Sequence, residues 1–168
     1  METCQSGRLY LFAKEAGCKR PREFESPRFR KFMLIEKDNI FNEVKALELP
    51  LGEYCVVGGG VLSAHSLRPH GDIDLLITKK LQAELEKRDW QKVQKRIDFE
   101  VLVFKNVEAS TDMVTLENYK PNINEVIKKS DIINDIPFSN LLDVVDFKKA
   151  LGREKDLTDI KLIKSFLK

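Results

Sequence analysis

Two aspartates, Asp72 and Asp74, stand on either side of an isoleucine in an otherwise apolar run. On a β-strand they would point to the same side, with Cβ atoms roughly 6–7 Å apart. Their charges would then repel each other, and their ionisation would be coupled. A divalent cation removes that conflict, because Mg²⁺ or Mn²⁺ binds through a few carboxylates and completes its shell with water and substrate phosphates. A solvated strand edge would accommodate the same pair, so the aspartates alone do not decide between the two interpretations.

Two neighbouring features favour the metal site. Gly58 and Gly59 follow the apolar run that ends at Val57, and a turn without side chains lets backbone N–H groups approach a phosphate closely. Glycine turns are common and are weak evidence by themselves. A third carboxylate is available further along, at Asp98 or Glu100, again with one residue between them. The chain therefore offers a glycine turn, a carboxylate pair and a third carboxylate on three short predicted strands.

The stretch VVGGGVLSAHSLRPHGDIDLLIT, residues 56–78, resembles the signature of the DNA polymerase beta-like nucleotidyltransferase superfamily. That signature is a hydrophobic strand, a glycine pair, a connecting segment and Asp-x-Asp between apolar residues. The stretch RIDFEVLVF, residues 96–104, is placed to supply the third acid of the family. The resemblance maps that acid onto Asp98, with Glu100 as the alternative. The chain is most similar to small bacterial branches, namely the antibiotic-modifying and the toxin-type enzymes.

A second segment, DFKKALGREKDLTDI, is similar to the helical tail of the toxin-type and related enzymes. The residues that match its pattern are Lys148, Arg153, Lys155, Asp156 and Asp159. The resemblance implies that Lys148 and Lys155 bind the triphosphate, although both lysines would also suit a solvated helix face. Asp156 is equally suited to capping the last helix. Arg68 matches an arginine that often precedes the aspartate pair, whereas His70 replaces the usual threonine.

The resemblance implies transfer of a nucleoside monophosphate from a triphosphate such as ATP to a hydroxyl, with release of pyrophosphate. Asp72, Asp74 and Asp98 would hold Mg²⁺ or Mn²⁺, and Gly58, Gly59 and Arg68 would help to bind the nucleotide. The acceptor stays open between an RNA, a protein and a small molecule such as an aminoglycoside or lincosamide. A cognate antitoxin is a further expected partner if the toxin-type branch applies. A catalytically inactive member that acts as a binding partner is the non-enzymatic alternative.

These residues need a scaffold, and hydrophobic periodicity predicts one of alternating helices and strands. Strands are expected at residues 54–57, 72–78 and 96–104. Helices are expected at residues 34–48, 61–67, 79–90, 122–129 and 141–151, followed by a last helix that carries Leu157, Ile160, Ile163 and Leu167 as its apolar stripe. Ser139 is the expected N-cap and Gly152 the expected stop of the helix at 141–151. The order predicts an α+β fold, with a small mixed β-sheet flanked by helices and a helical C-terminal tail.

The domain organisation follows from composition. Residues 1–32 carry eight Lys/Arg against four Asp/Glu, and the remainder carries 21 against 23. The first segment has no helical or strand period and reads as disordered, as a basic arm, or as an extension foreign to the native protein. The last interpretation draws on Phe24 to Pro27, which resembles the translated T-arm consensus of a transfer-RNA gene, and it would start the protein at Met33. Residues 33–168 are expected to form a single domain, with a catalytic core at 33–106 and a mostly helical tail at 122–168.

The chain shows no apolar run long enough to span a membrane and no signal-peptide core. Its three cysteines, Cys4, Cys18 and Cys55, have neither an even count nor metal-ligand spacing. A reducing, cytoplasmic environment is therefore expected. His65 and His70 are the only histidines, and no Ser-His-Asp or Cys-His set is visible in the sequence.

Overall fold

The computed structural model describes residues 40–96, 99–113, 119 and 121–168. The chain divides into two units, Met1–Ile35 and Glu36–Lys168, and only the second contains described residues. The expectations for residues 1–32, for the start of the first helix and for Asp98 lie outside the described residues. No helix in the described part of the chain is long and apolar enough to cross a membrane.

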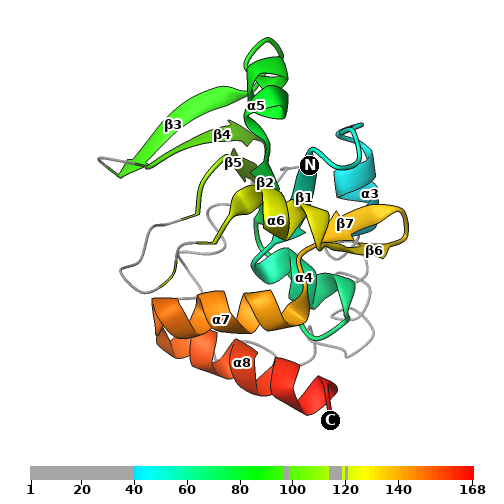
Figure 1. The fold of residues 1–168 in the computed structure, drawn as a ribbon, viewed down its shortest axis with the longest axis vertical. Helices are drawn as coiled ribbons and strands as arrows, with labels where there is room; N and C mark the ends of the chain where they lie inside the picture. Colours follow the sequence, from blue (N-terminus) through cyan, green and yellow to red (C-terminus); the bar gives the residue numbers. More distant parts are fainter. Residues whose placement is uncertain (1–39, 97–98, 114–118, 120) are drawn as a thin grey trace, which may run out of the picture. The chain divides into compact units, whose positions relative to one another are not determined.

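A seven-stranded mixed sheet forms the centre of the second unit, with strand order β3-β4-β5-β2-β1-β7-β6 (Figure 1). Its strands are β1 (Tyr54–Val57), β2 (Ile73–Ile77), β3 (Gln91–Arg96), β4 (Phe99–Phe104), β5 (Val107–Ser110), β6 (Asp131–Ile133) and β7 (Ile136–Phe138). The pairs β2–β5 and β1–β7 are parallel, and the other neighbours are antiparallel. The α+β prediction is confirmed, and the sheet is larger than the small one that the sequence suggested.

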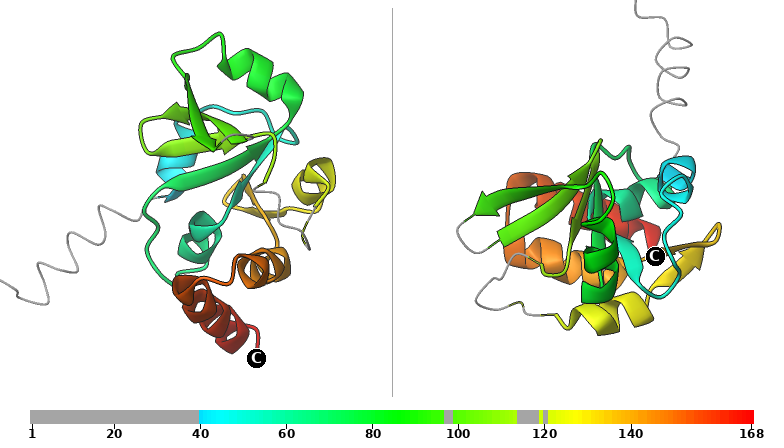
Figure 2. Two further views of the ribbon diagram at one scale, coloured as in Figure 1. Left: turned by 90° about the vertical axis from the view of Figure 1, so that its left-hand side faces the viewer. Right: turned by 90° about the horizontal axis from the view of Figure 1, so that it is seen from above.

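Helices lie on both faces of the sheet (Figure 2). They are α3 (Ile40–Lys45), α4 (Gly59–Ala64), α5 (Lys79–Leu85), α6 (Ile123–Lys128), α7 (Leu141–Leu151) and α8 (Glu154–Phe166). On one face, side chains of α3, α4 and α5 join the main core, which also includes apolar residues of α7 and α8. On the other face, Ile127 of α6 packs in a smaller cluster with Val57, Leu76 and Met113. Helices α7 and α8 lie side by side (Figure 1).

The alternation along β2 explains how the acids fit into an apolar strand. Ile73, Leu75 and Ile77 are buried in the main core, because successive side chains of a strand point to opposite faces. Asp74 therefore lies on the face of the smaller cluster, together with Leu76. The sequence expectation that the three apolar residues face the core is confirmed.

Local signals set the ends of the C-terminal helices. The Asn140 side chain accepts a hydrogen bond from the backbone N–H of Leu142 at 2.8 Å and caps α7, so the expectation of Ser139 as N-cap was wrong by one residue. Gly152 ends α7 with φ of 64°, as expected from its position. In α8, Ile160 and Ile163 are buried, whereas Leu157 and the C-cap residue Leu167 are about half exposed. Two of the four residues of the expected apolar stripe are therefore buried in the core.

The region between Trp90 and Phe138 differs most from the expectation. The strand expected at 96–104 corresponds to β4. Strand β3 was not expected, and it pairs with β4 from Gln91 opposite Val103 to Arg96 opposite Phe99. Strands β5, β6 and β7 were not expected at all. They are short. Strand β5 pairs with β2 and β4, and β7 pairs with β1, whereas β6 pairs with β7, which follows it directly in the chain.

Candidate active site

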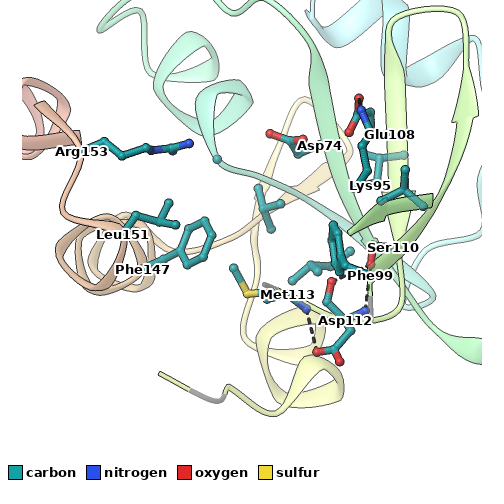
Figure 3. A pocket seen from close by; sticks show the side chains of 15 residues that line it. Asp74, Lys95, Phe99, Glu108, Ser110, Asp112, Met113, Phe147, Leu151 and Arg153 are labelled. Carbon is teal, nitrogen blue, oxygen red and sulfur yellow. Dashed lines mark hydrogen bonds and ion pairs between the residues drawn. The ribbon is translucent and has the colours of Figure 1, made fainter. Parts of the chain in front are cut away.

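Asp74 and Glu108 face each other across the middle of the sheet. Strands β2 and β5 run parallel, and their register places Asp74 opposite Glu108, at the separation of neighbouring strands, about 4.8 Å between backbones. Both residues line a cavity of about 420 Å³, and Figure 3 shows their carboxylates close together at its edge. A cavity of this volume is within the range of small-molecule sites.

The surroundings of Asp74 disfavour the charged form of its carboxylate. Burial raises its pKa to about 6, and the negative charges of Asp72 and Glu108 add to the effect. The positive charges of Lys148 and Lys155 act in the opposite direction. Among the described residues, none donates a hydrogen bond to Asp74 or forms an ion pair with it. The site therefore concentrates negative charge that the protein itself compensates incompletely.

The glycine turn lies directly against this carboxylate. Gly58 has φ of 63° and ψ of −130°, a backbone conformation that L side chains rarely adopt. A Cβ atom at Gly58 would lie 2.9 Å from Asp74 Oδ2. Gly60 is required for a different reason, because its Cβ would meet Val56 and Ile40 at 2.7 and 2.8 Å. Gly58 thus belongs to the site, and Gly60 allows α4 to pack closely on β1.

The acids that the sequence predicted for the site lie in different environments in the structure. Asp72 is exposed and precedes β2, and its charge acts on Asp74. Asp98 lies outside the described residues. Glu100 on β4 lies 3.5 Å from Lys92 and is not among the residues that line the cavity. Glu108 was missed, because a lone acid in the four-residue segment Val107–Ser110 gives no signal until the register of β2 and β5 is known.

A second group of charges, at the junction of α7 and α8, is almost completely paired. Lys148 Nζ donates to Asp156 Oδ1 at 3.1 Å and lies 2.7 Å from Asp159 Oδ2. Arg68 donates from Nε and Nη2 to the two oxygens of Asp159, at 2.6 and 2.8 Å. Arg153 Nε donates to Asp156 Oδ2 at 2.6 Å. We refer to these five residues as the ion cluster.

The ion cluster stabilises its acids in the charged form. Burial acts to raise the pKa of Asp156, but hydrogen bonds from Arg153 and Lys148 hold it below its usual value. Burial likewise opposes ionisation of Asp159, and hydrogen bonds from Arg68 and Lys148 lower its pKa. Asp156 therefore does more than cap α8, because it is fully buried between two cations.

The cations that were expected to bind a nucleotide differ in their contacts and in their exposure. Lys148 is only 5% exposed, and its ammonium contacts two carboxylates. Arg68 forms its paired contact with Asp159, and its guanidinium also lies against Gly59, 3.4 Å from where a Cβ would be. Lys155 is exposed and close enough to Asp74 to lower its pKa. Arg153, which the tail motif also contains, lines the cavity and points towards it (Figure 3).

The remaining wall of the cavity is largely apolar. Phe147 and Leu151 come from α7, Phe99 and Val101 from β4, and Met113 follows β5. Figure 3 shows Phe147, Leu151 and Met113 grouped on the side of Arg153. Tyr119 packs behind Phe147, with 5.6 Å between ring centroids. The cavity thus combines acids at one edge with an aromatic and aliphatic wall.

The loop before Asp72 is held by a histidine that the sequence left unassigned. The His70 ring is hydrogen-bonded through Nδ1 to Ser63 Oγ at 3.0 Å, and Nε2 lies 3.5 Å from Glu43 Oε1. Ser63 belongs to α4 and Glu43 to α3, so buried His70 joins both helices to the loop. The sequence shows no Ser-His-Asp set, and the contacts of His70 with Ser63 and Glu43 were not anticipated, because β1 and α4 separate Glu43 from His70 in the chain. His65 packs edge-on against Phe166 at 5.4 Å.

Metal binding would rely on few protein ligands. Within the described residues, no group of three or more His, Cys, Asp or Glu side chains is placed to hold a metal ion. Asp74 and Glu108 supply two carboxylates on one face. Mg²⁺ is commonly bound by one or two carboxylates together with water and substrate phosphates, so the donor set fits a metal that arrives with a nucleotide.

No family model and no curated protein matches the chain. A search of solved structures finds similarity to the crystal structure of ANT(2")-Ia in complex with adenylyl-2"-tobramycin. The TM-score is 0.45 and the sequence identity is 16%, and the match covers 83% of this chain and 90% of that one.

Proposed function

We propose that the protein is a metal-dependent nucleotidyltransferase, which moves a nucleoside monophosphate from a triphosphate to an acceptor hydroxyl. The observation that carries the proposal is the pairing of Asp74 with Glu108 beside the Gly58 turn. The two carboxylates lie in register on neighbouring strands. Asp74 has a raised pKa and no cationic partner among the described residues, so an external cation would stabilise the pair. The Asp-x-Asp signature in residues 56–78 supports the same conclusion from the sequence.

Each part of the cavity has a role in this proposal. Asp74 and Glu108 hold the metal, with Asp72 contributing negative charge from the loop. Gly58 leaves room for the phosphates, because a side chain at this position would fill the space beside Asp74. Lys155 and Arg153 lie near enough to Asp74 for their charges to interact with it, and they would neutralise the triphosphate. Arg153 also pairs with Asp156 in the ion cluster, but it lines the cavity. Lys148 and Arg68 are left out of this set because the ion cluster engages them and neither is among the residues that line the cavity.

The apolar wall suits the nucleobase. Phe147 offers an aromatic face, and Met113 and Leu151 offer flexible aliphatic contacts on the same side of the cavity. A bound Mg²⁺ or Mn²⁺ would lower the pKa of the attacking hydroxyl and stabilise charge on the phosphate. The new bond forms between the acceptor oxygen and the α-phosphorus, and the bond to pyrophosphate breaks. Orientation by the cavity walls would supply most of the protein's contribution.

The test is transfer of label. The full chain is incubated with Mg²⁺ or Mn²⁺ and each α-³²P-labelled nucleoside triphosphate, together with an RNA pool, a protein extract or a mixture of aminoglycosides and lincosamides. We expect labelled product in one of these pools. Asp74→Asn should reduce the rate at least about 1,000-fold, because a metal site contributes several kcal/mol to such a displacement.

Glu108→Gln and Glu100→Gln form a matched pair, since both acids lie on neighbouring strands and each contacts a lysine of β3. The proposal expects a large loss for Glu108→Gln and little change for Glu100→Gln. Asp98→Asn, assayed in parallel, tests the acid that the resemblance favours. Equal transfer by wild type and Asp74→Asn would reject Asp74 as part of the active site. No transfer to any pool, together with no binding of metal-bound nucleotide, would reject the enzymatic proposal in favour of an inactive binding protein.

A further inference from the structure

Lys95 reaches the carboxylate site from two strands away. The pairing of β3 with β4 shifts register between Gln94 and Arg96, so Lys95 is the extra residue of a β-bulge. Bulges often re-aim side chains beside functional sites. From this position the side chain extends past β4 to β5, where Nζ donates to Glu108 Oε1 at 2.6 Å. Figure 3 shows Lys95 and Glu108 together at the edge of the cavity, next to Asp74.

Lys95 is the cation that the described structure offers directly to these acids. Its hydrogen bond to Glu108 raises the pKa of its ammonium group, and the charges of Asp72 and Asp74 add to that effect. Arg68, Lys148 and Arg153 are engaged by Asp156 and Asp159 instead. Within the described residues, one ammonium is thus hydrogen-bonded at a site of three carboxylates, and it compensates only part of their charge.

Lys92 lies on the same strand as Lys95 and offers a comparison, because it forms ion pairs away from the cavity. It pairs with Glu86 at 2.9 Å and lies 3.5 Å from Glu100, and its side chain is half exposed. It is not among the residues that line the cavity. Two lysines three residues apart therefore form similar ion pairs, but the partner of only one of them is a proposed metal ligand.

We propose that Lys95 is a displaceable counter-ion, which neutralises Glu108 before metal binds and then moves to the phosphates of the nucleotide. The proposal rests on the nucleotidyltransferase function proposed above. A divalent cation on Glu108 would lie within a few Å of the ammonium and repel it. The Lys95 stem is long and flexible, and its side chain is 40% exposed, so the ammonium can turn into the cavity. Lys95 would thereby compete with the metal alone and assist the metal–nucleotide complex.

The experiment measures binding of two probes to the full chain by calorimetry. The first is Mn²⁺ alone, and the second is Mg²⁺ with a non-hydrolysable ATP analogue. Lys95→Met should bind Mn²⁺ about tenfold more tightly than wild type, because an internal competitor has been removed. The same variant should bind the Mg²⁺–nucleotide complex about tenfold more weakly, because a phosphate contact is lost. Circular dichroism confirms that each variant is folded.

Lys92→Met is the matched control and should equal wild type with both probes. The proposal is overturned if Lys95→Met behaves like Lys92→Met, or if its Mn²⁺ affinity does not rise. It is also overturned if Mn²⁺ affinity rises while nucleotide affinity is unchanged, because Lys95 would then not reach the phosphates. Failure of the proposed function looks different, since wild type and Lys95→Met would then both bind neither probe, whereas failure of this inference alone leaves wild-type binding intact.

Discussion

The ion cluster and the carboxylate site both hold acids inside the protein, but they balance charge in opposite ways. In the ion cluster, three cations contact Asp156 and Asp159, and the hydrogen bonds from these cations keep the pKa values of both carboxylates below their usual value. In the carboxylate site, Asp74 has no partner among the described residues and a pKa raised to about 6. Within the part of the chain that the structure describes, Glu108 has a single partner, Lys95.

Under the proposed function, the ion cluster is a structural arrangement and the carboxylate site is a functional one. Buried charges that are paired and hydrogen-bonded hold segments of chain together, and here they join the loop at Arg68 to α7 and α8. A carboxylate that is buried without a partner costs stability, and proteins tolerate that cost where a ligand compensates for it. Our proposal therefore assigns Lys148 and Arg68, which the resemblance placed with the nucleotide, to the ion cluster that they contact.

The largest effect that would test this comparison comes from the ion cluster. Lys148→Met leaves Asp156 and Asp159 buried with less positive charge, and we expect a loss of about 3–5 kcal/mol in the free energy of unfolding. Urea denaturation followed by circular dichroism measures it. Lys149→Met is the control, because Lys149 is exposed and pairs with exposed Asp146, and it should cost less than about 1 kcal/mol. Similar losses for both variants would show that the cluster is not a structural centre.

A smaller effect is expected at the turn beside Asp74. Gly58→Ala places a methyl group in a strained backbone conformation and 2.9 Å from Asp74 Oδ2, and it should cost about 2–3 kcal/mol. Gly71→Ala is the control, since a Cβ there meets nothing within 4 Å, and its effect should stay below about 1 kcal/mol. Thermal unfolding of both variants measures the difference. An unchanged midpoint for Gly58→Ala would mean that the turn can relax away from Asp74.

The smallest effect concerns Asp74 itself, in metal-free protein with EDTA. Its pKa rises from 3.8 to about 6 on folding, so between these values the folded state binds more protons than the unfolded state. This contribution therefore lowers stability as pH rises through that window, and the full penalty remains at neutral pH. Asp74→Asn should stabilise the protein by about 1–2 kcal/mol at pH 7.5.

The same substitution should have little effect at pH 4, where Asp74 is already protonated in the folded protein. The acids of the ion cluster have the opposite slope, because their lowered pKa values give stability that is present above about pH 4 and lost below it. Urea denaturation of wild type and Asp74→Asn at several pH values measures both trends. A destabilised Asp74→Asn at pH 7.5 would show that Asp74 is compensated after all, and the comparison would fail.

Much of the scaffold was predictable because its signals are local. Strand β1 and helix α7 have the predicted bounds, since a continuous apolar run and a periodic segment before Gly152 define them. Strand β2 was expected one residue longer at each end. Strand β3 was missed because Val93 is its one apolar residue, so its segment lacks the alternation that predicts a strand. Strands β6 and β7 are three residues each, which is too short for any period to be detected.

The sequence by itself determined that Asp74 shares a strand with core residues and follows a glycine turn, because alternation and backbone freedom are properties of neighbouring residues. It also marked Lys148, Arg153, Asp156 and Asp159 as one motif. Only the tertiary structure decided which of these charges neutralise one another and which carboxylate faces Asp74. Glu108 lies 34 positions from Asp74 in the sequence, and a parallel strand register, which no local pattern encodes, brings the two together.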